Sequence, residues 1–379
     1  MTRIKPPSLQ GDPAPGLVCD RDRDRDRDRD RDPVRRRRFA GAVLALCLAA
    51  APGCASQPQV TPGADAASIG RGVARLGREA DGVRPLVRTR WAAELIAAVP
   101  SLPTVPPRRI YRSADGSRFY GELEAQALSP SARAALVPET VDETAYYYGD
   151  GASPLFYARL LDLVAEGTVA GMPGRRFLIW RSESIAALRL LAIGGAAAIG
   201  MNPSPRLRAA YGQPGDQGAV PLVGREVSGQ VTLVPSDFQA GGSVGQPVDA
   251  IFVRNVLKRG YVHPAEPVQA GPGAQPLALG GSDEEFVRSL YNALKPGGRL
   301  ILYNLCPPLR PGQPYDPDSD CRNPIAREVW QAAGFRVRDY DRSDTPAARE
   351  FGKALGFGEG AGAVNLDELS ATYSLLERL

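Results

Sequence analysis

The sequence predicts an α/β protein built on a doubly wound parallel sheet, and three observations carry this prediction. From residue 153 to the end of the chain, helical and strand patterns alternate without a break, as in parallel sheets with helices on both faces. Most predicted strands are short apolar runs without polar alternation, which is typical of inner strands covered on both sides. Hydrophobic residues make up 43% of the 379 residues, enough for a full core.

The clearest element is a helix, a turn and a strand near residue 300. Ser282 is the expected N-cap of the helix, and Glu285 stands three residues later, where it completes a capping box. Pro296 cannot continue the helix, and Gly297 can adopt the left-handed conformation that ends it. Residues 299–305 then form an apolar run, which predicts a buried strand.

Periodicity places the other elements of the sheet domain. Strands are expected at Arg176–Trp180 and at 196–201, 230–234, 248–257, 299–305, 335–340 and 371–377. Helices are expected at 155–166, 184–192, 203–211, 283–294 and 324–333. Ahead of them, residues 69–99 have a helical pattern, and an Asp115-Gly116 turn predicts a small hairpin.

The amino terminus has the features of an export signal. An Asp/Arg alternation at 20–32 and four arginines at 35–38 precede an apolar run at 39–52, which is about as long as a signal-peptide core. The segment that ends at Cys54 resembles the lipobox of bacterial lipoproteins, and residues 36–39 resemble a twin-arginine signal. We therefore expect export to the bacterial cell envelope with a lipid anchor on Cys54. An uncleaved anchor or a cytoplasmic helix is the alternative, and the protein would stay cytoplasmic if the signal is not used.

The predicted organisation has four parts. Residues 1–54 form the leader and signal peptide, 55–68 a linker, 69–144 a helical and hairpin cap, and 145–379 the sheet domain. Residues 1–53 hold twelve Lys/Arg and eight Asp, so the rest of the chain has 34 basic and 34 acidic residues. This neutral balance gives no argument for a nucleic-acid partner. A small molecule or an envelope protein is the expected partner, with the membrane reached through the lipid.

Few residues suit metal binding or disulfide formation. His263 is the single histidine of the chain. This argues against a zinc site and against a Ser-His-Asp triad. Cys306 and Cys321 lie in one Pro/Gly/Asp-rich loop. In an oxidising compartment they could form a disulfide, and two free thiols beside a loop are the alternative.

The segment ALKPGGRLIL at 293–302 resembles the step into the fifth strand of class I S-adenosylmethionine (SAM)-dependent methyltransferases. The resemblance covers about residues 145–379, where five segments fall in the order of that family. It implies a seven-stranded, Rossmann-like sheet with an antiparallel last strand, and SAM as the cofactor.

The resemblance also points to cofactor-binding positions. In the family, a glycine-rich loop follows the first strand, an acidic residue ends the second, and an Asp follows the third. In this chain Arg181 and Glu183 stand at glycine positions, Asn202 replaces the ribose-binding acid, and Asp237 keeps the adenine position. The side chains of Arg181 and Glu183 are expected to fill the space that glycines leave empty, and they could pair with each other.

Two positions are candidates for contact with a substrate. His263 follows the fourth strand and could act as a base, although a solvated loop histidine is the alternative. Asn304 ends the fifth strand and could orient a ligand or cap the loop. The motifs identify no catalytic residue.

Two functions follow from the sequence and remain open. One is a SAM-dependent methyltransferase-like protein of the bacterial envelope whose SAM loop is degenerate, which is also the pattern of a pseudoenzyme. The other is a non-catalytic envelope lipoprotein that uses the methyltransferase fold as a binding or scaffold module.

Overall fold

The computed structural model describes residues 69–149, 152–221, 229–266, 277–308, 312, 314–359 and 364–379. All of them belong to one compact unit. The predicted leader, signal peptide and linker, including Cys54, lie outside the described residues. In the part of the chain that is described, no helix is both long and apolar enough to cross a membrane.

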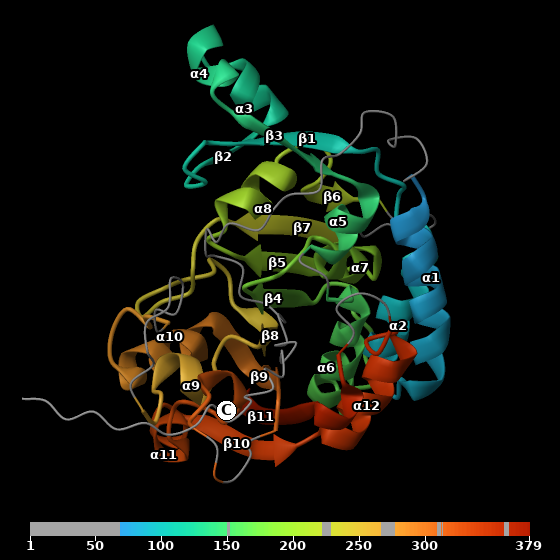
Figure 1. Cartoon of the computed structure of the whole chain (residues 1–379). Coiled ribbons are helices and arrows are strands. Elements are labelled where there is room, and N and C mark those ends of the chain that lie inside the picture. Colours follow the sequence, from blue (N-terminus) through green and yellow to red (C-terminus); the bar gives the residue numbers. More distant parts are fainter. Residues whose placement is uncertain are drawn as a thin grey trace, which may run out of the picture. The chain divides into compact units, whose positions relative to one another are not determined.

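The central sheet contains one antiparallel strand in its interior and a short antiparallel strand at one edge. Its strands are β4 (Arg176–Trp180), β5 (Ala197–Met201), β6 (Gly218–Val220), β7 (Gly229–Val234), β8 (Val248–Arg254), β9 (Leu294–Cys306), β10 (Phe335–Ser343) and β11 (Ser370–Arg378). They are ordered β10-β11-β9-β8-β4-β5-β7-β6 (Figure 1). The strands β7, β5, β4, β8 and β9 are parallel neighbours, whereas β11 runs antiparallel to both β9 and β10.

This topology confirms the predicted doubly wound, Rossmann-like sheet with an antiparallel last strand. The strand β6 adds an eighth, short edge strand that pairs antiparallel with β7. From β4 the chain first moves outward through β5 and β7, and then returns to the other side of β4 at β8. The crevice at such a reversal is where doubly wound sheets bind ligands, beyond the carboxyl ends of the strands.

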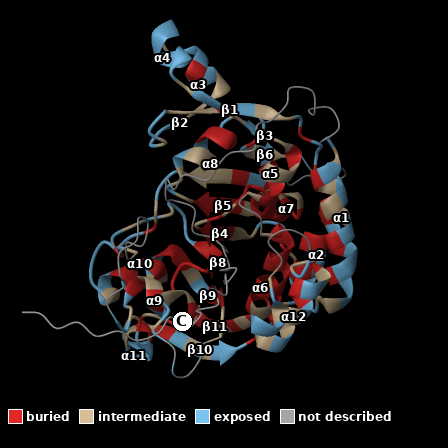
Figure 2. Cartoon of the chain, viewed as in Figure 1, coloured by how far each residue is buried: buried red, intermediate tan, exposed pale blue. Residues whose placement is uncertain are grey.

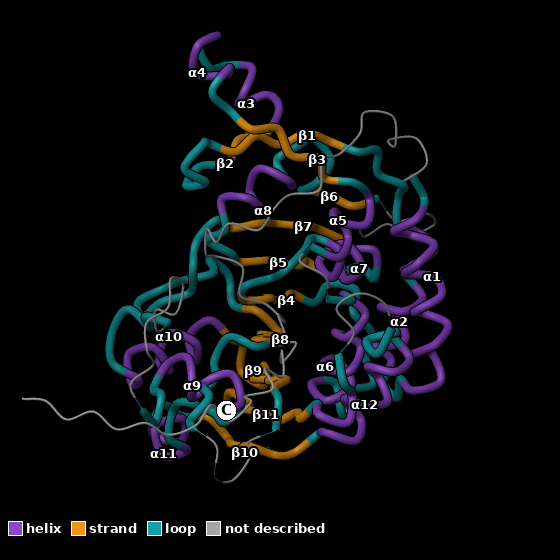
Figure 3. Tube along the Cα trace, in the orientation of Figure 1, coloured by secondary structure: helices purple, strands orange, loops and turns teal. Residues whose placement is uncertain are grey.

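Helices cover both faces of the sheet (Figure 3). One core contains residues of α6 (Tyr157–Val164), α7 (Ala186–Ile193) and α12 (Thr345–Ala354), and the other contains residues of α10 (Asp283–Ala293) and α11 (Arg327–Ala332). Every residue of β8 is buried. Phe252 packs in the first core, and its neighbours Ile251 and Val253 pack in the second, because successive strand residues point to opposite faces. The burial pattern in Figure 2 follows this arrangement.

The helix α10 begins as predicted. Ser282 accepts a hydrogen bond from the backbone N–H of Glu285, and the Glu285 side chain completes the capping box. Gly297 adopts a left-handed conformation, with φ of 73°. It does so within β9, where the register with β8 shifts between Leu294 and Arg299, and not at the helix end, because α10 stops at Ala293.

The start of α11 differs from the prediction. The helix begins at Arg327, and Asn323 does not cap it. The Asn323 side chain accepts a hydrogen bond from the backbone N–H of Ile325, and the backbone N–H of Asn323 donates to the Asp341 side chain. The helix α12 was not expected from the sequence.

The chain before residue 150 packs against the sheet domain. It contains α1 (Arg71–Val83), α2 (Arg90–Ala97), β1 (Arg108–Arg112), β2 (Phe119–Gly121), α3 (Glu122–Gln126), α4 (Pro130–Ala134), β3 (Val137–Val141) and α5 (Glu143–Tyr148). The strands form a second sheet in the order β2-β1-β3, and β1 and β2 are the predicted hairpin. Residues of α1 and α2 share the first core with α6 and α7, so the predicted boundary at residue 144 divides a continuous core.

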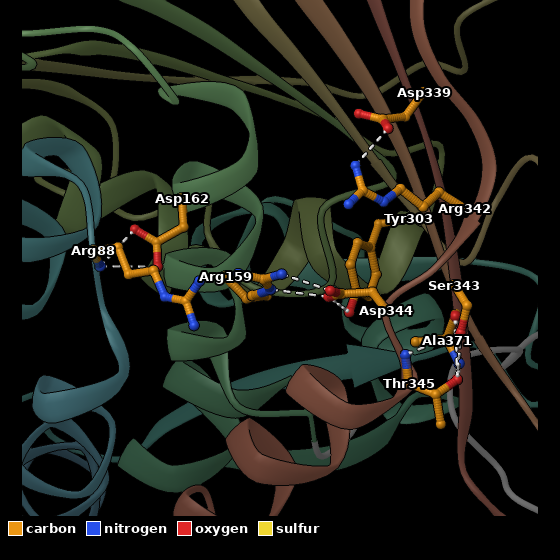
Figure 4. A network of polar contacts seen from close by, with 10 residues as sticks. All are labelled: Arg88, Arg159, Asp162, Tyr303, Asp339, Arg342, Ser343, Asp344, Thr345 and Ala371. Carbon is orange, nitrogen blue, oxygen red and sulfur yellow. Dashed lines mark hydrogen bonds and ion pairs between the residues drawn. The ribbon is translucent and has the colours of Figure 1, made fainter.

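Buried ionic contacts join the helices to the sheet. In Figure 4, Arg159 of α6 donates through Nε to Asp344 (2.9 Å), and the Tyr303 hydroxyl of β9 donates to the same carboxylate (2.7 Å). Burial and the nearby Asp344 charge raise the pKa of Tyr303 well above its usual value, so the phenol stays a neutral donor. The network thus links α6, β9 and the start of α12.

Candidate functional site

The carboxyl ends of the parallel strands carry most of the predicted site residues. The loop after β4 contains Arg181 and Glu183, Asn202 follows β5, and Asp237 follows β7. Arg254 is the last residue of β8. These side chains divide between two neighbouring regions, which we call the ionic cluster and the cavity. The ionic cluster is Trp180, Arg181, Glu183, Asp237 and Arg254.

Asp237 is held by two side chains from the end of β4. Arg181 donates through Nε to Asp237 Oδ1 (3.0 Å) and forms an ion pair with Oδ2, and Trp180 donates through its indole N–H to Oδ1 (2.6 Å). The backbone of Arg181 is left-handed, with φ of 52°, a conformation that glycine adopts without cost. The loop therefore keeps a glycine-like backbone at this position while an arginine side chain occupies the adjacent space.

Glu183 pairs with Arg254, so the predicted Arg181–Glu183 pair is wrong. The Arg254 side chain is only 1% exposed and lies 5.0 Å from the centre of the Tyr157 ring. The side chains of Arg181 and Glu183, which stand at the glycine positions, thus have partners on opposite sides of β4. Asp237 follows β7, and Arg254 ends β8. Each finds an opposite charge that is far away in the sequence.

Asn202 is committed to the local backbone. Its Nδ2 donates to the Ser182 carbonyl (2.9 Å), and its Oδ1 accepts from the N–H of Ser204 (2.8 Å). Ser204 in turn is the N-cap of α8 (Pro205–Ala210). Asn202 therefore fastens the β4 loop to the start of α8 and has no second oxygen to offer a ribose diol.

The residues at this edge do not fit SAM. The side chains of Arg181 and Glu183 replace the glycines, and Asp237, which stands at the adenine position, already accepts bonds from Trp180 and Arg181. Asn202 uses both ends of its amide within the loop. We accordingly derive no methyl-transfer step from this geometry.

The predicted substrate-side residues have structural contacts. Asn304 is 2% exposed and donates through Nδ2 to the carbonyls of Leu257 and Cys321, both at 2.9 Å. His263, whose side chain is 49% exposed, lies 2.9 Å from Asp283 at the start of α10. The structure does not bring His263 and Asn304 into contact with each other.

A disulfide joins Cys306 at the end of β9 to Cys321, with 6.1 Å between their Cα atoms. Nearby, Lys258 is buried and donates through Nζ to the Leu305 carbonyl (2.8 Å). Asn255 has a φ of 56° and accepts from the N–H of Leu305 (2.7 Å). These contacts fix the ends of β8 and β9, and sequence reasoning did not assign either residue a role.

The cavity lies beside the ionic cluster and has a volume of about 470 Å³. Its floor is formed by residues that follow β4, β5 and β7, one wall by α8 with the loop after it, and the opposite wall by α3. The apolar side chains that line it are Leu123, Leu207, Ala209, Tyr211, Pro214, Leu233, Val234 and Pro235. Of the four predicted cofactor positions, only Asn202 borders it.

Sequence reasoning missed this cavity. Its walls come from α3 and α8, which are separated by 79 positions in the chain, from Gln126 to Pro205, and are joined by contacts of Arg208. Arg208 forms an ion pair with Glu124 and donates through Nη2 to the Phe119 carbonyl (3.0 Å). No local pattern signals such a long-range approach.

Among the described residues, no group of three or more His, Cys, Asp or Glu side chains is placed to hold a metal ion. No protein-family model matches the chain, and no curated protein matches it.

Several solved structures are similar to the chain at low identity. The cyclase SpnF is 21% identical over 58% of this chain and 80% of that one, with a TM-score of 0.34. The cyclopropane synthase MmaA2 from Mycobacterium tuberculosis is 14% identical over 58% and 83%, with a TM-score of 0.36. The N-methyltransferase NodS from Bradyrhizobium japonicum WM9 is 12% identical over 59% and 94%, with a TM-score of 0.32. Because the sequence identities and TM-scores are this low, no activity or ligand of these proteins is assigned to the chain.

Proposed function

We propose that this protein is a non-catalytic binding module with a methyltransferase-like fold, held at the bacterial cell envelope. The observation that carries the proposal is the engagement of Asp237 by Trp180 and Arg181. A SAM adenine at this position would have to compete with these donors for the Asp237 carboxylate. Loss of the ion pair with Arg181 costs less than the roughly 3–5 kcal/mol of a fully buried pair, because the two side chains are 34% and 17% exposed. The ion pair between Glu183, which stands at a second glycine position of this loop, and Arg254 at the end of β8 adds a second pair of charges beside it.

Titration of the full-length chain with SAM by calorimetry tests this proposal. We expect no saturable binding by protein whose circular dichroism shows that it is folded. Saturable micromolar binding would overturn the proposal and restore the alternative, a SAM-dependent methyltransferase.

A variant of the loop after β4 distinguishes a SAM site that Arg181 blocks from the absence of a SAM site. Arg181→Gly removes the side chain that pairs with Asp237 and suits the left-handed backbone at this position. If blockage is the cause, this variant gains measurable SAM affinity. Glu183→Gly is the matched control, because it leaves Asp237 engaged and removes only the ion pair with Arg254; equal gains in both variants would argue against blockage by Arg181.

The envelope location belongs to the same proposal and rests on the sequence of residues 35–54. A lipid on Cys54 would hold the sheet domain near a membrane through the linker at 55–68. Metabolic labelling with a palmitate analogue should mark the wild-type protein and fail to mark Cys54→Ala. Equal labelling of both would refute lipidation at this residue.

A further inference from the structure

We propose that the cavity between α3, α8 and the ends of β5 and β7 binds a neutral, largely apolar small molecule that carries one hydrogen-bonding group. This inference rests on the proposed function, since it assigns the ligand of the binding module. Cavities of roughly 300–1,000 Å³ hold drug-sized ligands, and the volume of about 470 Å³ falls in that range.

The polar side chains around the cavity are mostly turned toward the protein backbone. Ser184 donates through Oγ to the Tyr147 carbonyl (2.8 Å), and Asn202 bridges Ser182 and Ser204. Gln217 donates to the Tyr211 carbonyl and accepts from the N–H of Leu233. The surface that remains for a ligand is therefore mainly aliphatic, which favours an apolar body.

Ser182 provides the polar contact. It lines the cavity, and the residue is 3% exposed. A ligand with one donor or acceptor can hydrogen-bond to this hydroxyl, which both donates and accepts. Gly200 of β5 makes room for this hydroxyl, because a Cβ at Gly200 would lie 2.7 Å from Ser182 Oγ.

The charged side chains at the rim of the cavity do not favour a charged ligand. Arg208 is engaged by Glu124 and by the Phe119 carbonyl. Glu122 lies in the first turn of α3, where a carboxylate is favoured by the helix dipole, and it is partly open to solvent. A charged ligand would lose hydration in the aliphatic interior without gaining a buried counter-charge.

Fluorescence titration of the full-length chain with N-phenylnaphthylamine tests the inference. This dye is neutral and apolar, carries one N–H, and brightens in apolar surroundings. We expect saturable binding that Leu207→Trp, which fills the cavity, weakens by about ten-fold or more. Ser182→Ala should weaken it by about five-fold, the effect of one hydrogen bond.

A surface variant covers the possibility that Leu207→Trp disturbs the fold. Leu123 borders the cavity from α3 and is 67% exposed, so Leu123→Glu should leave folding intact and still weaken dye binding by about ten-fold. Val169→Glu is the matched control, because Val169 is 87% exposed and does not line the cavity; it should bind the dye like wild type.

Other outcomes overturn the inference. No saturable dye binding, or equal binding by Leu123→Glu and Val169→Glu, would show that the cavity holds no apolar ligand. Displacement of the dye by adenosine would indicate a nucleoside site, and stronger binding of a cationic alkylammonium probe that is lost in Glu122→Gln would indicate a cation site. Calorimetry with SAM is read separately: SAM binding refutes the proposed function, whereas failure of the dye alone refutes only this assignment.

Discussion

The ionic cluster and the cavity lie side by side at the same edge of the sheet, yet their chemistry is opposite. In the cluster, charged side chains pair with one another: Arg181 with Asp237, and Glu183 with Arg254. In the cavity, polar side chains bond to the backbone and aliphatic groups face the space. The comparison teaches that a doubly wound sheet can fill its usual cofactor position with protein charges and still keep room for a ligand next to it.

The largest expected effect comes from breaking the cluster at its most buried charge. Arg254→Ala leaves Glu183 without its ion pair in a site where the arginine is 1% exposed. We expect a loss of about 3–5 kcal/mol in the free energy of unfolding, measured by urea denaturation. The cavity should bind its dye unchanged in protein that remains folded.

A surface pair provides the control for this variant. Arg338 pairs with Glu377 at 3.1 Å, and its side chain is 37% exposed, so Arg338→Ala should cost less than about 1 kcal/mol. Equal costs for Arg254→Ala and Arg338→Ala would show that burial does not distinguish the cluster. Arg254→Met combined with Glu183→Leu should recover part of the loss, since it removes both charges.

The next largest effect on stability is expected from the disulfide at the end of β9, the strand that pairs with β8. Cys306 and Cys321 enclose a sequence separation of 15, for which loss of the cross-link should cost about 3 kcal/mol. Dithiothreitol should lower the urea midpoint of the wild-type protein to that of Cys306→Ser/Cys321→Ser. The double variant should not respond to dithiothreitol. If reduction of the unfolded wild-type protein does not increase its number of reactive thiols, the prediction is contradicted.

A pH-dependent effect is expected at Asp320, next to the disulfide. Burial alone would raise the pKa of Asp320, but hydrogen bonds from Arg322 (2.7 and 2.8 Å) outweigh it and hold the pKa below the usual 3.8. Because the folded pKa is depressed, the carboxylate stabilises the fold above pH 3.8, and this stability is lost as the pH falls through the folded value. Asp320→Asn should cost about 1.5–3 kcal/mol at pH 7, and the difference from wild type should shrink below pH 3.8.

Asp249 serves as the comparison for that pH profile, at the opposite edge of the sheet. Its carboxylate accepts hydrogen bonds from Lys295, from the backbone of Arg176 and from Arg175. These bonds outweigh burial and also lower its pKa. Asp249→Asn should therefore show the same sign of pH dependence while leaving the disulfide loop intact. A cost that grows on acidification in either variant would contradict the assigned direction.

The elements that local sequence determines were predicted well. The strand Arg176–Trp180 was placed with the bounds that the structure has, because an apolar run between polar loops is a local signal. The capping box of Ser282 and Glu285 was also found, since its two partners are three residues apart. The helix α12 was not predicted, although Thr345–Ala354 is a full helix.

The site depends on contacts that local patterns cannot select. From the sequence, Arg181 could pair with Glu183, two residues away. In the structure its partner Asp237 is 56 residues distant, and Glu183 pairs with Arg254 at a separation of 71. Several carboxylates and guanidinium groups could satisfy either residue on charge alone. The strand order decides between them, because β8 lies on one side of β4 whereas β5 and β7 lie on the other.

The smallest effect should appear at the exposed contact that closes the cavity. Glu124 and Arg208 join α3 to α8, and their side chains are 46% and 43% exposed. Glu124→Gln should change the free energy of unfolding by less than about 1 kcal/mol, because solvent screens this pair. It should nevertheless speed dye exchange in stopped-flow measurements, since α3 forms a wall of the cavity. Arg84→Gln, which removes a similar exposed pair with Asp81 away from the cavity, is the control; equal dye exchange rates in both variants would mean that α3 does not control entry.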